Sequence, residues 1–336
     1  MKEVRKHARE LMEGYCRVCP VCNGKACAGE VPGMGGLGTG TSFMNNVAAL
    51  AAVRFNMRLL HGAKQPDTST ELLGFKLSMP VLAAPIGGVS FNMGGKITEE
   101  QYVEAVLGGC ADKGVVGCAG DGVPPFIIDS ALAGVKAFGG VPFIKPWEDK
   151  ELHEKLERAV EAGAKVVGMD VDAAGLVTLR LMGRPVGPKT VEELKAIIAS
   201  VPAKFVLKGV MTPDDAKRAV DAGAAGIVVS NHGGRVLDHT PGTAEALPGI
   251  AAAVKGQIAI LVDGGVRTGG DVLKMLALGA DATLIGRPVS IAAVGGLREG
   301  VGKYLDQVKS ELVQAMILTG CASVAEADAR LLFKGA

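Results

Sequence analysis

The sequence is poor in aromatic residues, in net charge and in long apolar segments. Only one Trp, three Tyr and nine Phe occur among 336 residues, so aliphatic side chains must build the core. The net charge of +1, without a long lysine or arginine block, gives no indication of a nucleic-acid partner. No apolar run reaches the length of about 18–20 residues that a membrane span needs. Since the first residues also lack the apolar stretch of a secretory signal, we expect a cytoplasmic protein.

From residue 79 onward, short apolar runs alternate with helix-like segments. The runs cover residues 79–85, 115–120, 141–147, 165–172, 204–210, 225–231, 258–265 and 282–288. One segment between them, "TPDDAKRAVDAGA" (212–224), begins with a Thr cap and a Pro at the first helical position. Continuous apolar runs indicate parallel strands covered on both faces. Eight such units favour a closed (β/α)8 TIM barrel over the alternative, an open doubly wound sheet.

The first 78 residues differ from the rest of the chain. We predict that residues 1–78 form a Cys- and Gly-rich extension that caps the barrel, because they lack the apolar pattern for a core of their own. Residues 79–336 then form the barrel domain with C-terminal helices. Within the extension we expect a helix over 45–60 and a short hairpin over 70–80. Near the C-terminus, the spacing predicts helices over 301–320 and 323–333.

Four of the seven cysteines lie within twelve residues: Cys16, Cys19, Cys22 and Cys27. Their C-x2-C-x2-C-x4-C pattern is similar to the ferredoxin run that binds an iron–sulfur cluster, with a last gap one residue longer. Four thiolates can also hold zinc in a structural site. Reduced thiols or a redox disulfide are the third alternative. The pattern favours an iron–sulfur cluster over zinc, and zinc over a site without metal.

Active sites of (β/α)8 barrels lie at the carboxyl ends of the strands. Glycine turns begin at the ends of the seventh and eighth runs, in "DGGVRTGGD" (263–271) and "IGRP" (285–288). Their backbone N–H groups, with Arg267 and Arg287, predict a phosphate site. The alternative for residues 263–271 is a simple turn before a helix, and the second turn on the next strand favours the phosphate site. Cys118, at the end of the second run, is a candidate to face a cofactor, with a packing role as the alternative.

The stretch "SNHGGR" (230–235) begins in the last two residues of the sixth run. His232 is a candidate general base, and Asp172, after the fourth run, could hold it in one tautomer. Arg235 offers a planar fork suited to a substrate carboxylate. The alternative is that His232 has only a structural role. However, Lys208, near the end of the fifth run, and the predicted phosphate site are expected at the same end of the barrel. The combination favours a catalytic role.

Three long segments carry a family resemblance. They are "LKGVMTPDDAKRAVDAGAAGIVVSNHGG", "SNHGGRVLDHTPGTAEALPGI" and "LVDGGVRTGGDVLKMLALGADATLIGRP". These segments resemble the FMN-dependent 2-hydroxy-acid oxidases and dehydrogenases, such as glycolate oxidase and lactate oxidase. The resemblance implies FMN as cofactor and oxidation of an L-2-hydroxy acid, a small molecule, to its 2-oxo acid. The electron acceptor would be oxygen, a quinone or a redox protein, and we expect a homo-oligomer. NAD(P)H oxidation and non-redox isomerisation with reduced FMN stay open as alternatives.

The resemblance also implies roles for single residues. His232 corresponds to the catalytic base, Asp172 to the residue that orients it, Arg235 to the carboxylate-binding residue and Lys208 to the lysine beside flavin N1. The remaining implied FMN contacts are Ala83, Ala84, Pro85, Ser230, Asp263, Gly265, Arg267, Gly286 and Arg287.

The substrate half departs from the family pattern. Tyr15 is the one tyrosine available for the N-terminal substrate contact, and Arg180 lies about one position from the second substrate arginine. Trp147 is the nearest aromatic residue after the third run. The sequence therefore predicts FMN binding more directly than it predicts the substrate.

Overall fold

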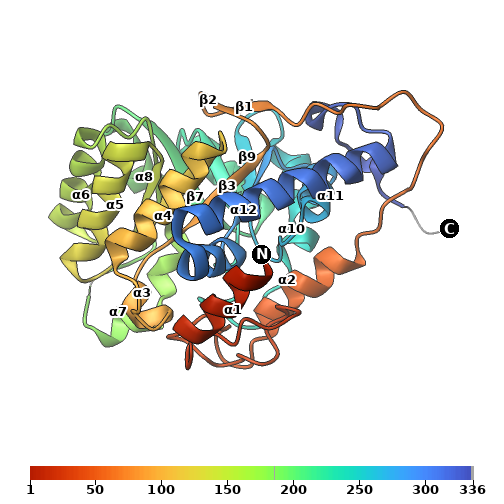
Figure 1. Cartoon of the computed structure of the whole chain (residues 1–336). Helices are drawn as coiled ribbons and strands as arrows, with labels where there is room; N and C mark the ends of the chain where they lie inside the picture. The colour runs from red at the N-terminus through yellow and green to blue at the C-terminus, as the bar shows by residue number, and fades with distance from the viewer. Residues whose placement is uncertain (185, 334–336) are drawn as a thin grey trace.

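The computed structural model describes residues 1–184 and 186–333, and its centre is a closed barrel of eight parallel strands (Figure 1). The strands follow one another in chain order, and the last pairs with the first. They are β3 (Val81–Ile86), β4 (Val116–Ala119), β5 (Val141–Ile144), β6 (Val166–Asp170), β7 (Lys204–Val210), β8 (Gly226–Val229), β9 (Ala259–Val262) and β10 (Ala282–Ile285). Each falls on one of the predicted apolar runs to within one residue, which confirms the (β/α)8 class.

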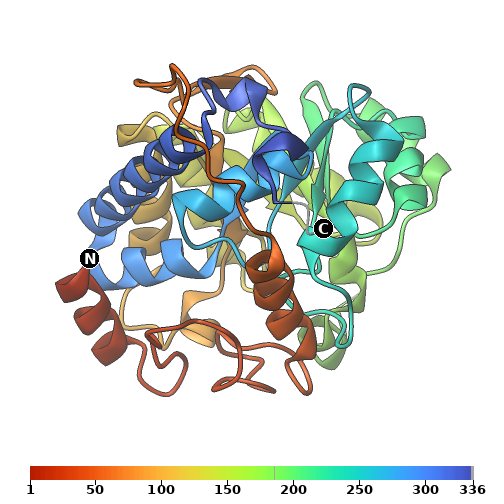
Figure 2. The same ribbon diagram turned by 90° about the vertical axis from the view of Figure 1, so that its right-hand side faces the viewer.

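Helices surround the barrel, as two perpendicular views show (Figures 1 and 2). The main ones are α4 (Glu99–Asp112), α5 (Pro125–Phe138), α6 (Asp149–Glu161), α8 (Val191–Ala199), α9 (Pro213–Asp221), α10 (Thr243–Val254), α11 (Gly269–Ala277) and α12 (Arg287–Thr319). Thr212 caps α9 as predicted, because its side chain accepts the N–H of Asp215. The predicted helix over 301–320 is the second part of α12, which is kinked at Gly296 and Leu297.

The barrel strands separate two apolar layers. Along β3, Val81 and Ala83 pack outward against the helices, whereas Leu82 and Ala84 point into the barrel, as the two-residue period of a strand requires. The inner layer is closed at the amino ends of the strands by the hairpin of β1 (Thr70–Leu72) and β2 (Phe75–Leu77). This hairpin confirms the expectation for residues 70–80, and the opposite end of the barrel is left for a site.

The N-terminal extension wraps around the other end of the molecule (Figure 1). Its first helix, α1 (Lys2–Leu11), packs against α12, and α2 (Thr41–Ala52) packs against α10. The helix predicted over 45–60 corresponds to α2, but it begins earlier and ends at Ala52, because Val53 turns to extended backbone. Short helices α3 (Val89–Asn92) and α7 (Val177–Leu181) lie at the same end as α1 (Figure 1).

The helix predicted over 323–333 is wrong. Two short 3-10 turns, Val324–Glu326 and Ala329–Leu331, occupy this stretch. Asp328 has extended backbone, and its side chain accepts the N–H of Arg330, so a new turn starts there. Residues 334–336 of the predicted barrel range lie outside the described residues. Within 1–184 and 186–333, no helix combines the length and apolar character needed to cross a membrane.

Candidate active site

A cavity of about 450 Å³ opens at the carboxyl ends of the barrel strands. It is lined by segments far apart in the chain, from the N-terminal extension to the start of α12. The sequence-predicted residues that line it are Tyr15, Ala84, Pro85, Lys208, His232, Arg235, Asp263, Gly265, Arg267, Gly286 and Arg287. The strand ends of the barrel and the N-terminal extension thus place these predicted residues around one cavity.

The turn after β8 directs the imidazole of His232 into this cavity. His232, Gly233 and Gly234 have φ values of 57°, 63° and 78°, three consecutive residues in the left-handed region. At Gly234 a Cβ atom would lie 2.4 Å from the backbone nitrogen of Phe43 in α2, so a side chain does not fit. Ser230 lies beneath the turn, where its hydroxyl accepts the N–H of His232 at 3.0 Å and donates to Asp263 at 2.8 Å.

Four side chains at the ends of β6, β7 and β8 form what we call the carboxylate corner: Asp170, Asp172, Lys208 and His232. The Nδ1 atom of His232 lies 3.0 Å from Asp172 Oδ1. A carboxylate at this distance holds the proton on Nδ1 and leaves Nε2 as an acceptor. The Nζ atom of Lys208 lies 3.0 Å from Asp170 Oδ1 and 3.4 Å from His232 Nδ1.

Burial and charge act in opposite directions in the carboxylate corner. Burial raises the pKa of Asp170, but the charges of Lys208, His232 and Lys145 outweigh it and lower the pKa to about 2. For Lys208, burial lowers the pKa, but the charges of Asp170 and Asp172 raise it well above its ordinary value. The pair is therefore ionised at neutral pH.

Asp170, Asp172 and His232 each offer a ligand atom within 4.8 Å of the others, a spacing that suits a metal ion. The ammonium group of Lys208, 3.0 Å from Asp170, already supplies positive charge at this position. We therefore assign these residues to proton and charge chemistry and not to a metal.

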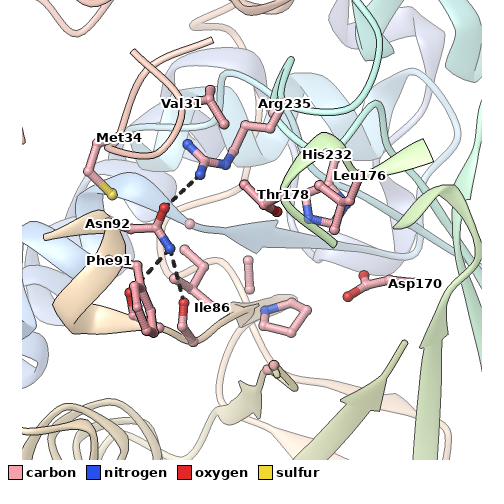
Figure 3. Close-up of a pocket in the computed structure, with 18 of the residues that line it drawn as sticks. Val31, Met34, Ile86, Phe91, Asn92, Asp170, Leu176, Thr178, His232 and Arg235 are labelled. Carbon is pink, nitrogen blue, oxygen red and sulfur yellow. Dashed lines mark hydrogen bonds between the residues drawn. The ribbon is translucent and has the colours of Figure 1, made fainter. Parts of the chain in front are cut away.

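Arg235, Arg267 and Arg287 form a second group, the guanidinium corner. Arg287 donates to the carbonyl oxygens of Met34 at 2.7 Å, Gly35 at 2.9 Å and Gly233 at 3.1 Å. Arg235 donates to Gly33 and Gly35 and, at 2.9 Å, to Asn92 Oδ1 (Figure 3). Burial first, and then the charges of Arg235 and Arg267, lower the pKa of Arg287. Since carbonyl dipoles and not carboxylates hold these guanidinium groups, the corner attracts an anion.

Two buried polar atoms, one of them in this corner, fit the phosphate and ribityl parts of FMN. Within the described part of the chain, Asp263 Oδ1 and Arg267 Nε have no hydrogen-bond partner although they are buried. A phosphate oxygen can accept from the guanidinium, and a ribityl hydroxyl can donate to the carboxylate. Gly265, with φ of 89°, packs so closely on α2 that a Cβ would lie 2.7 Å from Asn46 O. The residues present therefore fit the predicted cofactor.

Four predicted cofactor or substrate contacts do not line the cavity. Cys118 does not line the cavity: its Cα pairs with Val141 at the start of β5, and its side chain packs in the inner layer near the hairpin. Arg180 is exposed on α7, because Thr178 and Met182, four residues apart, face the cavity and Arg180 lies between them on the other side. The side chains of Ala83 and Ser230 also lie outside the cavity lining, in the outer layer and beneath the His232 turn.

Three residues of the cavity were not predicted from the sequence: Asp121, Lys145 and Asn92. Lys145 and Asp121 follow β5 and β4, where the strand-end rule selects them, and Lys145 Nζ lies 3.9 Å from Asp170 Oδ2. Trp147, which we considered as a substrate aromatic, is fully buried and donates to Asp121 Oδ2 at 2.5 Å. Asn92, on the short α3, binds Arg235, and no sequence signal indicates that role.

Comparison with known proteins defines the class. The family model described as FMN-dependent dehydrogenase matches residues 33–184 and 176–334. The chain is 34% identical over 337 residues to 4-hydroxymandelate oxidase from Amycolatopsis orientalis, covering 87% of this chain and 90% of the relative. It is 32% identical over 330 residues to glycolate oxidase 1 from Zea mays, covering 85% of each chain. A structure of a mandelate oxidase mutant with (S)-mandelic acid superposes with a TM-score of 0.80, 32% identity and coverage of 99% of this chain and 97% of that one.

The fold and the comparisons together define an FMN-dependent oxidoreductase. More particularly, the chain belongs to the family of FMN-dependent 2-hydroxy-acid oxidases and dehydrogenases, which confirms the resemblance stated from its motifs. FMN is supported as the cofactor by this membership.

Proposed function

We propose that this protein oxidises an L-2-hydroxy acid to the 2-oxo acid, with His232 as the base and Arg235 as the carboxylate-binding residue. One turn supports the proposal. His232 is paired with Asp172 at 3.0 Å, and Arg235, three residues later, lines the same cavity. A base and a cation are thus held together where a hydroxy acid presents a proton and a carboxylate.

The His232–Asp172 pair sets the direction of proton transfer. Because the Asp172 carboxylate accepts from Nδ1, Nε2 is the atom that takes a proton from the 2-carbon of the substrate or from its hydroxyl. FMN, when bound, accepts the two electrons. Lys208 places a fixed positive charge at the end of β7, where it favours negative charge that develops in the cavity.

Arg235 is held ready to bind a carboxylate. Its bonds to Gly33, Gly35 and Asn92 use three of the five N–H donors of a guanidinium and fix its plane. Figure 3 shows the bond to Asn92. Tyr15 lines the same cavity, and this position supports the predicted role of Tyr15 in substrate binding. Apolar side chains complete the lining of the cavity: Val31, Val123, Ile127, Leu176, Leu179 and Met182. We therefore propose that the substrate also carries an apolar side chain.

The test is anaerobic flavin reduction with L-lactate, glycolate and (S)-mandelate, monitored by bleaching of the visible flavin band. We expect at least one acid to reduce the wild-type flavin. His232→Ala should retain FMN but lose about 10²–10⁴-fold in the reduction rate, the usual contribution of a general base.

His153→Ala is the matched control, because His153 is exposed on α6, and it should reduce at the wild-type rate. Wild-type reduction rates in His232→Ala would contradict the role of His232. Reduction by NADH alone would contradict the substrate class.

A further inference from the structure

The four cysteines of the N-terminal extension surround one small cavity, separate from the active-site cavity. Cys16, Cys19, Cys22 and Cys27 all line it, together with Arg287 and residues of the extension. None of the four forms a disulfide in the described structure. Nothing in the proposed oxidation of a hydroxy acid uses them, so their convergence needs a separate explanation.

The loop that carries the cysteines is shaped to turn their sulfur atoms inward. Val18, between the first two cysteines, has φ of 44°, a left-handed conformation that is unusual for a β-branched residue. Its N–H donates to Cys16 Sγ at 3.4 Å. Arg5 and Arg9 of α1 donate to the carbonyl oxygens of Cys19 at 2.6 Å and Val18 at 2.9 Å, which fixes the strained turn from outside. N–H groups in such turns commonly face anionic ligands, iron–sulfur clusters included.

Positive charge adjoins the sulfur atoms. Arg267 Nη2 lies 3.7 Å from Cys22 Sγ, and Arg287 lines both the cysteine cavity and the active-site cavity. Four thiolates on one centre carry net negative charge, which guanidinium groups at this distance offset. The guanidinium corner thus adjoins a second candidate anionic group beside the phosphate site.

The cysteine spacing in the sequence separates the metal alternatives. Cys16, Cys19 and Cys22 form one uninterrupted C-x2-C-x2-C run, as in the ferredoxin-type segments that bind iron–sulfur clusters. Zinc sites with four cysteines typically combine two separate C-x2-C pairs, roughly 15–20 residues apart. The run therefore favours an iron–sulfur cluster.

We propose that Cys16, Cys19, Cys22 and Cys27 bind a [4Fe–4S] cluster between α1 and the β9–β10 end of the active-site mouth. The two C-x2-C steps match the spacing with which ferredoxin-type runs bind a cubane. Cluster binding also explains how a glycine-loaded segment with few apolar side chains is ordered, since metal binding energy offsets chain entropy. The site stands independently of the substrate proposed above.

The experiment is metal analysis of the full-length protein purified without oxygen. We expect iron and acid-labile sulfide in equal amounts, about four of each per chain. After chemical reduction, electron paramagnetic resonance should show a cluster signal that is distinct from the flavin. One zinc per chain without sulfide would overturn the proposal, and so would metal-free protein that retains FMN.

Two variants localise the centre. Cys19→Ser/Cys22→Ser should lose iron and sulfide while FMN content, measured separately, shows whether the barrel is folded. Cys321→Ser is the matched control, because Cys321 is outside the loop and donates to Ser323 O at 3.1 Å, a bond that serine preserves. Full iron content in the double variant would place the cluster elsewhere and overturn the assignment. If the double variant does not fold, the analysis of the wild-type protein still decides the proposal.

Discussion

The two corners of the active-site cavity differ in the partners of their buried positive charges. In the carboxylate corner, Lys208 lies 3.0 Å from Asp170, and His232 lies 3.0 Å from Asp172. In the guanidinium corner, Arg235 and Arg287 donate to backbone carbonyls of the extension and of the His232 turn. In the first corner, Lys208 and His232 each have a carboxylate partner before any ligand arrives. The second retains positive charge for an anionic ligand to neutralise.

The largest effect should come from unbalancing the carboxylate corner. Lys208→Met leaves Asp170 buried without its main partner, and the loss of one member of a buried ion pair lowers the free energy of unfolding by about 3–5 kcal/mol. Urea unfolding of the FMN-free protein measures this change. Lys204→Met, at the exposed start of the same strand, is the control and should change stability little. Equal effects for both lysines would show that the pair does not stabilise the fold.

The guanidinium corner should respond mainly in cofactor affinity. Arg287→Lys keeps the charge but loses the planar set of bonds to Met34, Gly35 and Gly233. We expect FMN to bind about 10- to 100-fold more weakly, or about 1.4–2.8 kcal/mol. Titration of the FMN-free protein by flavin fluorescence gives the dissociation constant. Arg218→Lys on the exposed face of α9 is the control, and an unchanged constant in Arg287→Lys would remove this residue from the phosphate site.

A third effect, confined to acid, tests the ionisation of the carboxylate corner. Because the folded-state pKa of Asp170 is about 2, below its value near 3.8 in the unfolded chain, the ionised carboxylate stabilises the fold above about pH 4. This contribution is lost as the pH falls toward 2. The stability difference between the wild type and Asp170→Asn should shrink by about 2 kcal/mol over that range. A difference that stays constant with pH would mean that Asp170 is not held ionised by Lys208.

The barrel and its mouth were accessible from sequence because the pattern is local. An apolar run followed by a glycine turn and a capped helix is encoded within about thirty residues, and the strand-end rule then selects His232, Arg235, Arg267 and Arg287. The same rule applies to Lys145, which we overlooked. Arg180 failed for a local reason as well, since one position on a helix turns a side chain by about 100°.

What the sequence by itself determined is the fold class, the family and the residues at the strand ends, because these follow from periodicity and from motifs contiguous in the chain. Only the tertiary structure decided which charges are paired. Asn92 meets Arg235 across 143 residues, and Arg287 reaches the carbonyl of Met34 across 253. Contacts over such separations depend on barrel closure and on the path of the extension across the mouth. No local pattern encodes them, because each partner is specified by geometry that exists only after the strands have closed.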